Sequence, residues 1–172
     1  MPEEDTGYDE ALRTAGCSRR VIAHCHRVRD LALSFCDSSG VADRELVNAG
    51  ALLHDIGRAL SHSLSHAQTG AAWCREHGVP EDVSRIVERH TGAGLTADEC
   101  TLLRLLPVDC VPETIEEKIV ANADNLVKGG HEVSIHDRLG TSLYLGRKIR
   151  SRIYRLWLET EQFRRSGPVL KE

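Results

Sequence analysis

The sequence predicts an all-α protein that forms one helical bundle. Apolar residues recur at spacings of three and four along most of the 172-residue chain, which is the periodicity of amphipathic helices. No segment shows the sustained alternation of apolar and polar residues that a half-buried strand would have. With 41% hydrophobic residues the chain can bury a substantial core, and its length favours a single domain over two.

Breaks and caps set the boundaries of the expected helices in order. Ser18 is a suitable N-cap for a long helix that the DSSG segment ends, and Asp43 begins the next. Pro80 and Pro112 each stand where a helix opens, because proline suits a first helical position. The expected helices are 8–15, 18–36, 43 to between 54 and 57, 64–77, 80–90, 96–106, 112–128 and 143–165.

The remaining boundaries come from glycines and from one capping motif. Thr96 and Glu99 have the spacing of a capping box, so a short helix is expected to start there. Gly16 and Gly78 each end a helix, and the pair Gly129 and Gly130 is expected to end the helix that carries the segment ANADNL.

Charge is distributed unevenly along the chain. The net charge is −4, yet residues 138–172 hold nine Lys or Arg against three Glu. The expected last helix has an apolar stripe and a basic face, which suits a helix packed on the domain with its cations in solvent. A homodimer contact and an edge that faces a polyanion such as a nucleotide or RNA are the alternatives. Because the basic residues are confined to one end, nucleic acid is not expected as a general partner.

The six cysteines contain no Cys-x-x-Cys pair and lie in apolar-periodic segments, as buried reduced thiols do. The longest apolar runs are far shorter than a membrane span, and the first residues lack the pattern of a secretory signal. A cytoplasmic protein without a membrane partner is therefore expected.

Polar residues on buried helix faces are the strongest functional signal. His24 lies on the apolar stripe that contains Val21 and Val28, whereas His26 is on another face and is expected in solvent. His90 continues a second stripe, and Asp124 sits among apolar residues of a third. Any one of these could be a hydrogen-bonded core residue or part of a salt bridge. Taken together, inward-pointing histidines and carboxylates on several helices favour a shared metal centre in the core of a bundle.

His54 and Asp55 fit the same centre. Adjacent helix residues project about 100° apart, and a cation between those two directions near a helix end can bind both. His66 lies on a small-residue face that permits close helix packing, so it is preferred over His62 in the connecting segment. The second His-Asp pair, His136 and Asp137, follows no apolar run and is interpreted as a loop or helix cap.

This ordered set resembles the HD-domain metal-dependent phosphohydrolases. The resemblance covers about residues 18–130 and rests on His24, on LLHDIG, and on Asp124 in ANADNL; the whole chain also resembles small stand-alone archaeal HDIG proteins. It divides the chain into an N-terminal arm and short helix at 1–17, the HD domain at 18–130, and a C-terminal loop with a basic amphipathic helix at 131–172. Arg58 stands where the family motif often has lysine.

The resemblance implies a metal site and a reaction. One divalent ion would be bound by His24, His54, Asp55 and Asp124, and Asp55 would bridge to a second ion held by His66 and His90. Iron or manganese is favoured, with cobalt, nickel and zinc as alternatives. Such ions activate a water for attack on phosphorus, so the expected reaction is hydrolysis of a phosphoester or phosphoanhydride in a nucleotide-like substrate.

Catalytic and binding roles are expected near these ligands. Asp55 is expected to act mainly as a ligand and secondarily on the attacking water, and Arg58 is the first candidate for contacting phosphate. Arg89 and Lys128 are further candidates, each with the alternative of a solvated charge. The same ligand set also suits a di-iron HD oxygenase, and a closed site would suit a noncatalytic, metal-stabilised regulatory module.

Overall fold

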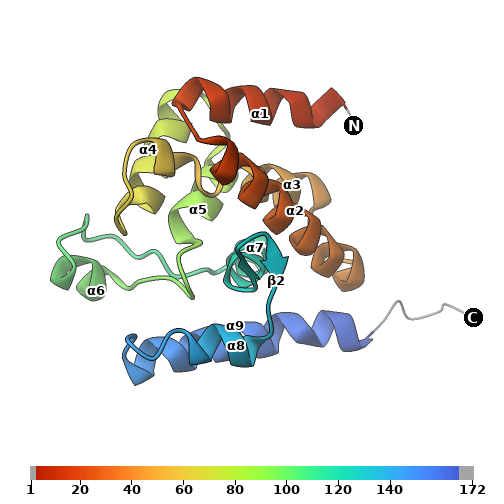
Figure 1. The fold of residues 1–172 in the computed structure, drawn as a ribbon, viewed down its shortest axis with the longest axis vertical. Coiled ribbons are helices and arrows are strands. Elements are labelled where there is room, and N and C mark those ends of the chain that lie inside the picture. The colour runs from red at the N-terminus through yellow and green to blue at the C-terminus, as the bar shows by residue number, and fades with distance from the viewer. Residues whose placement is uncertain (1–2, 167–172) are drawn as a thin grey trace, which may run out of the picture.

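The computed structural model describes residues 3–166, with side chains from 7 to 164. As the sequence predicts, the fold is an all-α bundle (Figure 1). Residues 167–172, which belong to the predicted C-terminal segment, lie outside the described part. The helices are α1 (Glu3–Ala15), α2 (Arg19–Ser39), α3 (Arg44–Leu53), the 3-10 helix η1 (Ile56–Ala59), α4 (His66–Glu76), α5 (Glu81–Arg89), α6 (Ala97–Leu102), α7 (Ile115–Asn125), α8 (Ile135–Gly140) and α9 (Arg147–Ser166).

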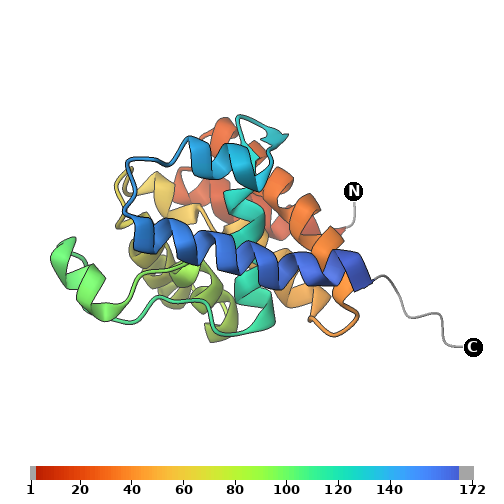
Figure 2. The ribbon, with the colours of Figure 1, turned by 90° about the horizontal axis from the view of Figure 1, so that it is seen from below.

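Two groups of buried side chains make up the core. The larger group packs α2, α3, α7 and α9 together, and its members include Phe35, Ile119 and Ile153. The smaller one joins α1 to α2, α3, α4 and α5, and includes Leu12 and Leu53. Accordingly α1 lies at one end of the bundle and α8 with α9 at the other, while α6 projects sideways in both views (Figures 1 and 2).

The observed caps explain where the helices begin and end. The Ser18 hydroxyl accepts a hydrogen bond from the Val21 amide at 3.3 Å, and α2 continues to Ser39 before Gly40 closes it with φ of 67°. The capping box at Thr96 is present as predicted. A second box, in which Thr114 is the N-cap and Glu117 accepts from its amide, starts α7 at Ile115, three residues after the predicted Pro112.

The glycine pair after α7 was wrongly predicted as a simple helix stop. Strands β1 (Val127–Lys128) and β2 (His131–Glu132) pair antiparallel, and Gly129 and Gly130 form the turn with φ of 58° and 81°. Two positive φ values are what a tight hairpin turn of this kind requires. Each strand has only two residues, which is too short to show a period-2 pattern in the sequence.

Close packing of η1 on α4 depends on two glycines. A Cβ on Gly57 would lie 1.9 Å from the carbonyl oxygen of His66, and one on Gly70 would lie 2.9 Å from the Gly57 nitrogen. Backbone therefore meets backbone at this point. The small-residue face predicted for α4 has this function, and it brings the start of α4 next to Asp55.

Helix α9 lies across α2 and α7, with Ile153 and Leu156 buried. Arg152 also donates hydrogen bonds to the Gly94 carbonyl oxygen at 2.9 Å and to Glu99 at 2.8 Å, which fixes the start of α6. Within residues 3–166, no helix has both the length and the apolar character required to cross a membrane.

Candidate metal centre

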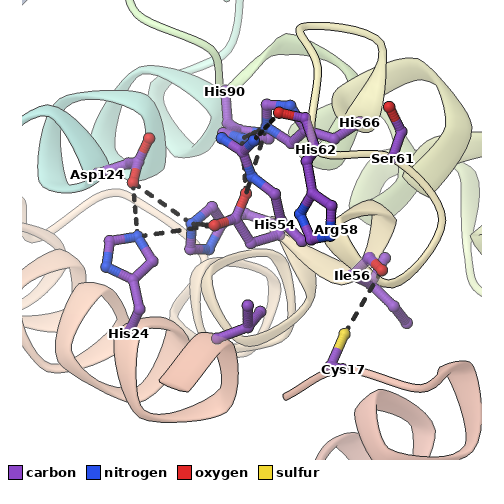
Figure 3. Close-up of polar contacts among 12 residues, drawn as sticks. Cys17, His24, His54, Ile56, Arg58, Ser61, His62, His66, His90 and Asp124 are labelled. Atoms are coloured by element: carbon purple, nitrogen blue, oxygen red, sulfur yellow. Dashed lines mark hydrogen bonds and ion pairs between the residues drawn. The ribbon is translucent and has the colours of Figure 1, made fainter. Parts of the chain in front are cut away.

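Six predicted ligands from five elements meet in the middle of the bundle (Figure 3). His24 comes from α2 and Asp124 from the last turn of α7. His54 and His90 are the C-cap residues of α3 and α5, and His66 is the first residue of α4. The sixth, Asp55, occupies the joint between α3 and η1 with φ of −100° and ψ of 14°. Because the helix has ended there, its side chain can turn away from the α3 axis toward the other five.

The two oxygens of Asp55 face different partners. Asp55 Oδ2 lies 3.9 Å from His24 Nε2 and 3.8 Å from His54 Nε2. Asp124 Oδ1 completes this first group, at 2.9 Å from His24 Nε2 and 3.4 Å from His54 Nε2. Asp55 Oδ1 lies instead 3.3 Å from His66 Nε2 and 3.6 Å from His90 Nε2, which form a second group.

Three of the histidines are oriented by the same local bond. His54 Nδ1 is 2.7 Å from the Ala51 carbonyl oxygen, His66 Nδ1 is 2.8 Å from that of Ser63, and His90 Nδ1 is 2.7 Å from that of Val87. A carbonyl oxygen can only accept, so each Nδ1 carries the proton and donates it. When the ring is neutral, it therefore presents the lone pair of Nε2 to the centre, which is the arrangement of a metal-binding histidine.

Without a cation, these lone pairs are poorly satisfied. His54 Nε2 is fully buried and has no hydrogen-bond partner. His66 Nε2 and His90 Nε2 are 3.1 Å apart, and with both protons on Nδ1 two lone pairs face each other. Histidine nitrogens and carboxylate oxygens are the donor set of transition-metal ions. Sets of these atoms within 4.8 Å of one another, from His24, His54 and Asp124 and from His54, Asp55 and His90, fit such an ion.

The electrostatic environment keeps the carboxylates charged. Burial alone raises the pKa of Asp55, but the nearby imidazoles of His54, His66 and His90 hold that pKa far below its usual value. Burial likewise opposes ionisation of Asp124, but the nearby imidazoles of His24 and His54 outweigh it and lower the pKa. Burial lowers the pKa of His90, which favours the neutral form that a ligand needs.

The centre is accessible from one side. The side chains of His24 and Asp124 are 25% and 24% exposed, whereas those of His54, His66 and His90 are at most 2% exposed. Solvent therefore reaches the group formed by α2 and α7. A metal site that keeps an open side can accept a water or a substrate, unlike a closed structural site.

The predicted phosphate-binding residues lie in three different environments. Arg58 is at the centre, where Nε donates to Asp55 Oδ1 at 3.2 Å and a terminal nitrogen donates to the His62 carbonyl oxygen at 3.1 Å. Lys128 is exposed on β1, four residues after Asp124. Arg89 is engaged elsewhere, in ion pairs with Glu113 at 3.0 Å and Glu117 at 3.1 Å. A role for Arg89 in substrate binding would require both ion pairs to open.

Two other histidine predictions have clear outcomes. His26 does not simply face solvent, because its Nε2 is 2.7 Å from Asp9 Oδ1 and the pair joins α2 to α1. The sequence gives no way of knowing that α1 packs there. The second pair, His136 and Asp137, lies in the first turn of α8 and is exposed, where Ser134 caps the Asp137 amide. This matches its interpretation as part of a helix cap.

Asn125 helps to position Asp124, and the sequence pattern does not predict this role. Its side-chain nitrogen donates to the Gly92 carbonyl oxygen at 2.7 Å, and its side-chain oxygen accepts two hydrogen bonds from Arg138 at 3.2 Å each. It thereby ties the end of α7, which carries Asp124, to the loop after His90. Helix periodicity does not distinguish Asn125 from the other polar residues of this helix. The one sequence feature that points to it is its position next to Asp124 in ANADNL.

Comparison with known proteins agrees with this geometry. A family model described as HD domain matches residues 21–129. The chain is 46% identical over 125 residues to an uncharacterized protein of Methanocaldococcus jannaschii, a match that covers 70% of this chain and 74% of that protein. It is also 46% identical over 127 residues to a tRNA (cytidine(56)-2'-O)-methyltransferase of Picrophilus torridus, where 74% of this chain corresponds to 37% of the relative.

More distant similarity is confined to shorter segments or to the fold. A ribonuclease Y of Acidothermus cellulolyticus is 54% identical over 50 residues, covering 28% of this chain and 10% of that protein. The HD domain of the phosphodiesterase PgpH from L. monocytogenes, in complex with cyclic-di-AMP, superimposes with a TM-score of 0.53 at 17% identity, covering 88% of this chain and 94% of that one.

Proposed function

Because the chain belongs to the HD-domain family, we propose that it is a metal-dependent phosphohydrolase that cleaves a phosphoester or phosphoanhydride bond of a nucleotide-like substrate. The observation that carries this proposal is the division of Asp55, with one oxygen toward His24 and His54 and the other toward His66 and His90. A carboxylate in this position suits two adjacent divalent ions, and paired ions suit phosphoryl chemistry.

Each ligand has a proposed place. His24, His54, Asp124 and Asp55 Oδ2 would hold one ion, and His66, His90 and Asp55 Oδ1 the other. Iron or manganese is the favoured metal, and cobalt, nickel or zinc would also suit these donors. When bound, such ions lower the pKa of a coordinated water and neutralise phosphoryl oxygens.

The protein's own groups position the substrate around that centre. Arg58 is held by Asp55 and the His62 carbonyl oxygen, which keeps its remaining N–H donors beside the ligands for a phosphate oxygen. Lys128, an exposed cation on β1 four residues after Asp124, would be a second phosphate contact. Asp55 would act as a ligand first, because a carboxylate committed to metal is a weak base.

The names of similar proteins support a nucleotide or a related phosphate ester as substrate. The PgpH domain is a phosphodiesterase seen with cyclic-di-AMP, and two kinds of relative are named for RNA, as ribonuclease Y and as a tRNA methyltransferase. The shared segment is only 37% of the methyltransferase, so the name of that relative does not support methyl transfer by this chain.

Metal content and hydrolysis together test the proposal. Protein purified without added metal should contain divalent ions, and it should hydrolyse at least one mononucleotide, cyclic nucleotide or dinucleoside polyphosphate. Asp55→Ala should lower activity by more than about 100-fold, the upper end for residues that merely orient metal ligands.

The second His-Asp pair provides a matched control. Asp137→Ala removes an exposed aspartate that also follows a histidine, and it should keep both metal and activity. Oxygen uptake without phosphate release would instead assign the centre to oxygenase chemistry. Bound metal with no turnover and no exchangeable water would assign it a regulatory or structural role.

A further inference from the structure

A cavity lies where α2 meets the β1–β2 hairpin and α9, and none of the proposed metal ligands lines it. Its volume is about 380 Å³, and its walls come from α2, the β1–β2 hairpin and the end of α9. The hairpin and α9 both contact α2 (Figure 1). The lining residues are Arg27, Asp30, Leu31, Ser34, Val127, Glu132 and Arg164.

The walls of the cavity lie close in sequence to His24 and Asp124, the two exposed ligands. Arg27, Leu31 and Ser34 follow His24 by three, seven and ten residues, which places them along one side of α2. At about 1.5 Å per residue, they extend from about 4.5 to about 15 Å along the helix axis. The other wall starts at Val127, three residues after Asp124. Both walls therefore continue the elements that supply the two exposed ligands.

Burial around α2 shows that His24 and the cavity face the same side. Ala23 and Arg27 are exposed, whereas Cys25 and Val28 are buried. The exposed edge of His24 must therefore point toward the Arg27 side of the helix. A molecule whose phosphate lies at the ligands can extend into the cavity without passing through the core.

The lining suits a nucleoside. Leu31 and Val127 supply apolar surface. Asp30 pairs with Arg29 at 2.9 Å and Glu132 with Arg164 at 3.2 Å, and the second oxygen of each carboxylate is an acceptor for hydroxyl or amino groups. Arg27 stands at the end nearest the centre, where its Nε donates to the Gly130 carbonyl oxygen at 3.0 Å. That bond fixes the guanidinium while the terminal nitrogens keep their donors for a phosphate. The volume lies at the lower end of the range for small-molecule sites, about 300 to 1,000 Å³.

We propose that this cavity is the subsite for the nucleoside attached to the scissile phosphate, with Arg27 contacting the phosphate at its entrance. The substrate class is thereby narrowed to esters that carry a nucleoside, and the inference rests on the proposed function. A nucleoside in this position would hold the phosphorus over the exposed side of His24 and Asp124. Binding of the nucleoside would then govern KM more than kcat.

Two chromogenic phosphodiesters with the same leaving group test the subsite. Thymidine 5′-(p-nitrophenyl phosphate) carries a nucleoside, and bis(p-nitrophenyl) phosphate does not. The wild-type, metal-loaded protein should have a kcat/KM for the thymidine ester at least about tenfold higher than for the other ester. That ratio corresponds to about 1.4 kcal/mol of binding free energy from the nucleoside. Ser34→Trp, which fills the cavity from an exposed wall position, should remove that preference through KM and leave the other ester within about twofold.

Further variants separate the subsite from a general defect. Asp30→Trp blocks the cavity from a position whose side chain is 57% exposed, so the substitution should not disturb folding. It should remove the preference for the thymidine ester as Ser34→Trp does, and it provides the test if Ser34→Trp folds poorly. Arg27→Ala should lower kcat/KM for both esters, since both contain the phosphate. Arg155→Ala removes an exposed arginine of α9 that does not line the cavity, and it should change neither rate.

The outcomes distinguish this inference from the proposed function. Equal loss of both esters in Ser34→Trp and Asp30→Trp, or no loss of either, would overturn the subsite while hydrolysis itself stands. If the wild type cleaves neither ester, the proposed function fails for these diesters, and binding of thymidine 5′-monophosphate to the Mn²⁺-loaded protein decides on the subsite. The two tryptophan variants should then weaken that binding at least about tenfold, and unchanged affinity would overturn the subsite.

Discussion

Asp55 is the ligand that faces both groups of the centre, and this makes metal stoichiometry sensitive to which residue is changed. His66→Ala removes a ligand of the second group alone, so it should reduce the bound metal from two ions to one. Asp124→Ala should do the same for the first group, and Asp55→Ala should weaken both. Elemental analysis after dialysis against trace metal measures the difference.

The neighbouring His62 is the matched control for these variants. It is exposed, and its backbone carbonyl oxygen accepts the bond from Arg58. His62→Ala should therefore retain both ions. Equal metal content in His66→Ala and wild type would show that the second group does not bind an ion.

Protonation of His54 predicts a pH dependence for metal binding. Burial lowers the pKa of His54, but Cys25 and the Asp55 and Asp124 carboxylates outweigh it and raise the pKa well above the usual value. In metal-free protein the ring thus stays protonated to a higher pH than an ordinary histidine does. A metal needs the neutral ring, so binding must release this proton.

Affinity should accordingly keep rising with pH above about 6.5, the usual histidine pKa, because His54 still carries its proton there. His90, whose pKa is lowered by burial, should contribute little to the proton release. Calorimetric titration with Mn²⁺ in two buffers of different ionisation enthalpy counts the protons released. Affinity that is independent of pH, with no proton release, would contradict the protonated state of His54.

At the scale of elements, the contact between η1 and α4 determines whether the two groups of ligands meet. A Cβ on Gly57 would lie 1.9 Å from the His66 carbonyl oxygen, so Gly57→Ala must move α4 and with it the His66 ring. The expected loss of unfolding free energy is about 3 kcal/mol, the upper end for overpacking. Bound metal should fall below two ions. Urea denaturation and metal analysis on the same samples measure both effects.

Gly7→Ala provides the comparison within a helix. A Cβ on Gly7 meets nothing within 4 Å, and alanine favours the helical backbone by about 0.5 to 1 kcal/mol relative to glycine. Stability should stay the same or rise slightly. If Gly57→Ala is as harmless as Gly7→Ala, the contact between η1 and α4 is not what positions His66.

These elements also show what a sequence reveals about such a centre. His24 and Asp124 were found because each lies on an apolar stripe, and a helix face follows directly from spacing. His66 was preferred to His62 for the small residues beside it, and the Gly57–Gly70 contact supplies the physical reason. Local periodicity and residue size therefore predict most of the helices, but not α8, and they single out residues that the structure brings together.

Tertiary arrangement accounts for what the sequence could not predict. The division of the Asp55 oxygens depends on the backbone between α3 and η1, and no local pattern records that bend. The contact of His26 with Asp9 depends on where α1 packs. The β1–β2 hairpin has strands too short for periodicity to detect, and its glycines equally resemble a helix stop.

For the whole molecule, the centre joins elements that are far apart in the sequence. Its ligands come from α2, the end of α3, α4, the end of α5 and α7. An ion bound here holds these elements together only in the folded chain, so its binding free energy adds to stability. His66 Nε2 and His90 Nε2 lie 3.1 Å apart, so in the neutral rings two lone pairs face each other, and a bound ion would relieve this repulsion.

Chelation should therefore lower the melting temperature of the whole domain in one cooperative step. An ion present at 100 times its dissociation constant stabilises by about 2.7 kcal/mol, and in a chain of this size each kcal/mol is worth about 2 to 4 °C. A drop of about 5 to 10 °C on EDTA treatment is expected for one ion, restored by adding Mn²⁺. Asp55→Ala should show little further loss, because it lacks the ligand that both ions share. A melting temperature that EDTA leaves unchanged, in protein shown to have lost its metal, would mean that the five elements are held by packing alone and that the ions act only in chemistry.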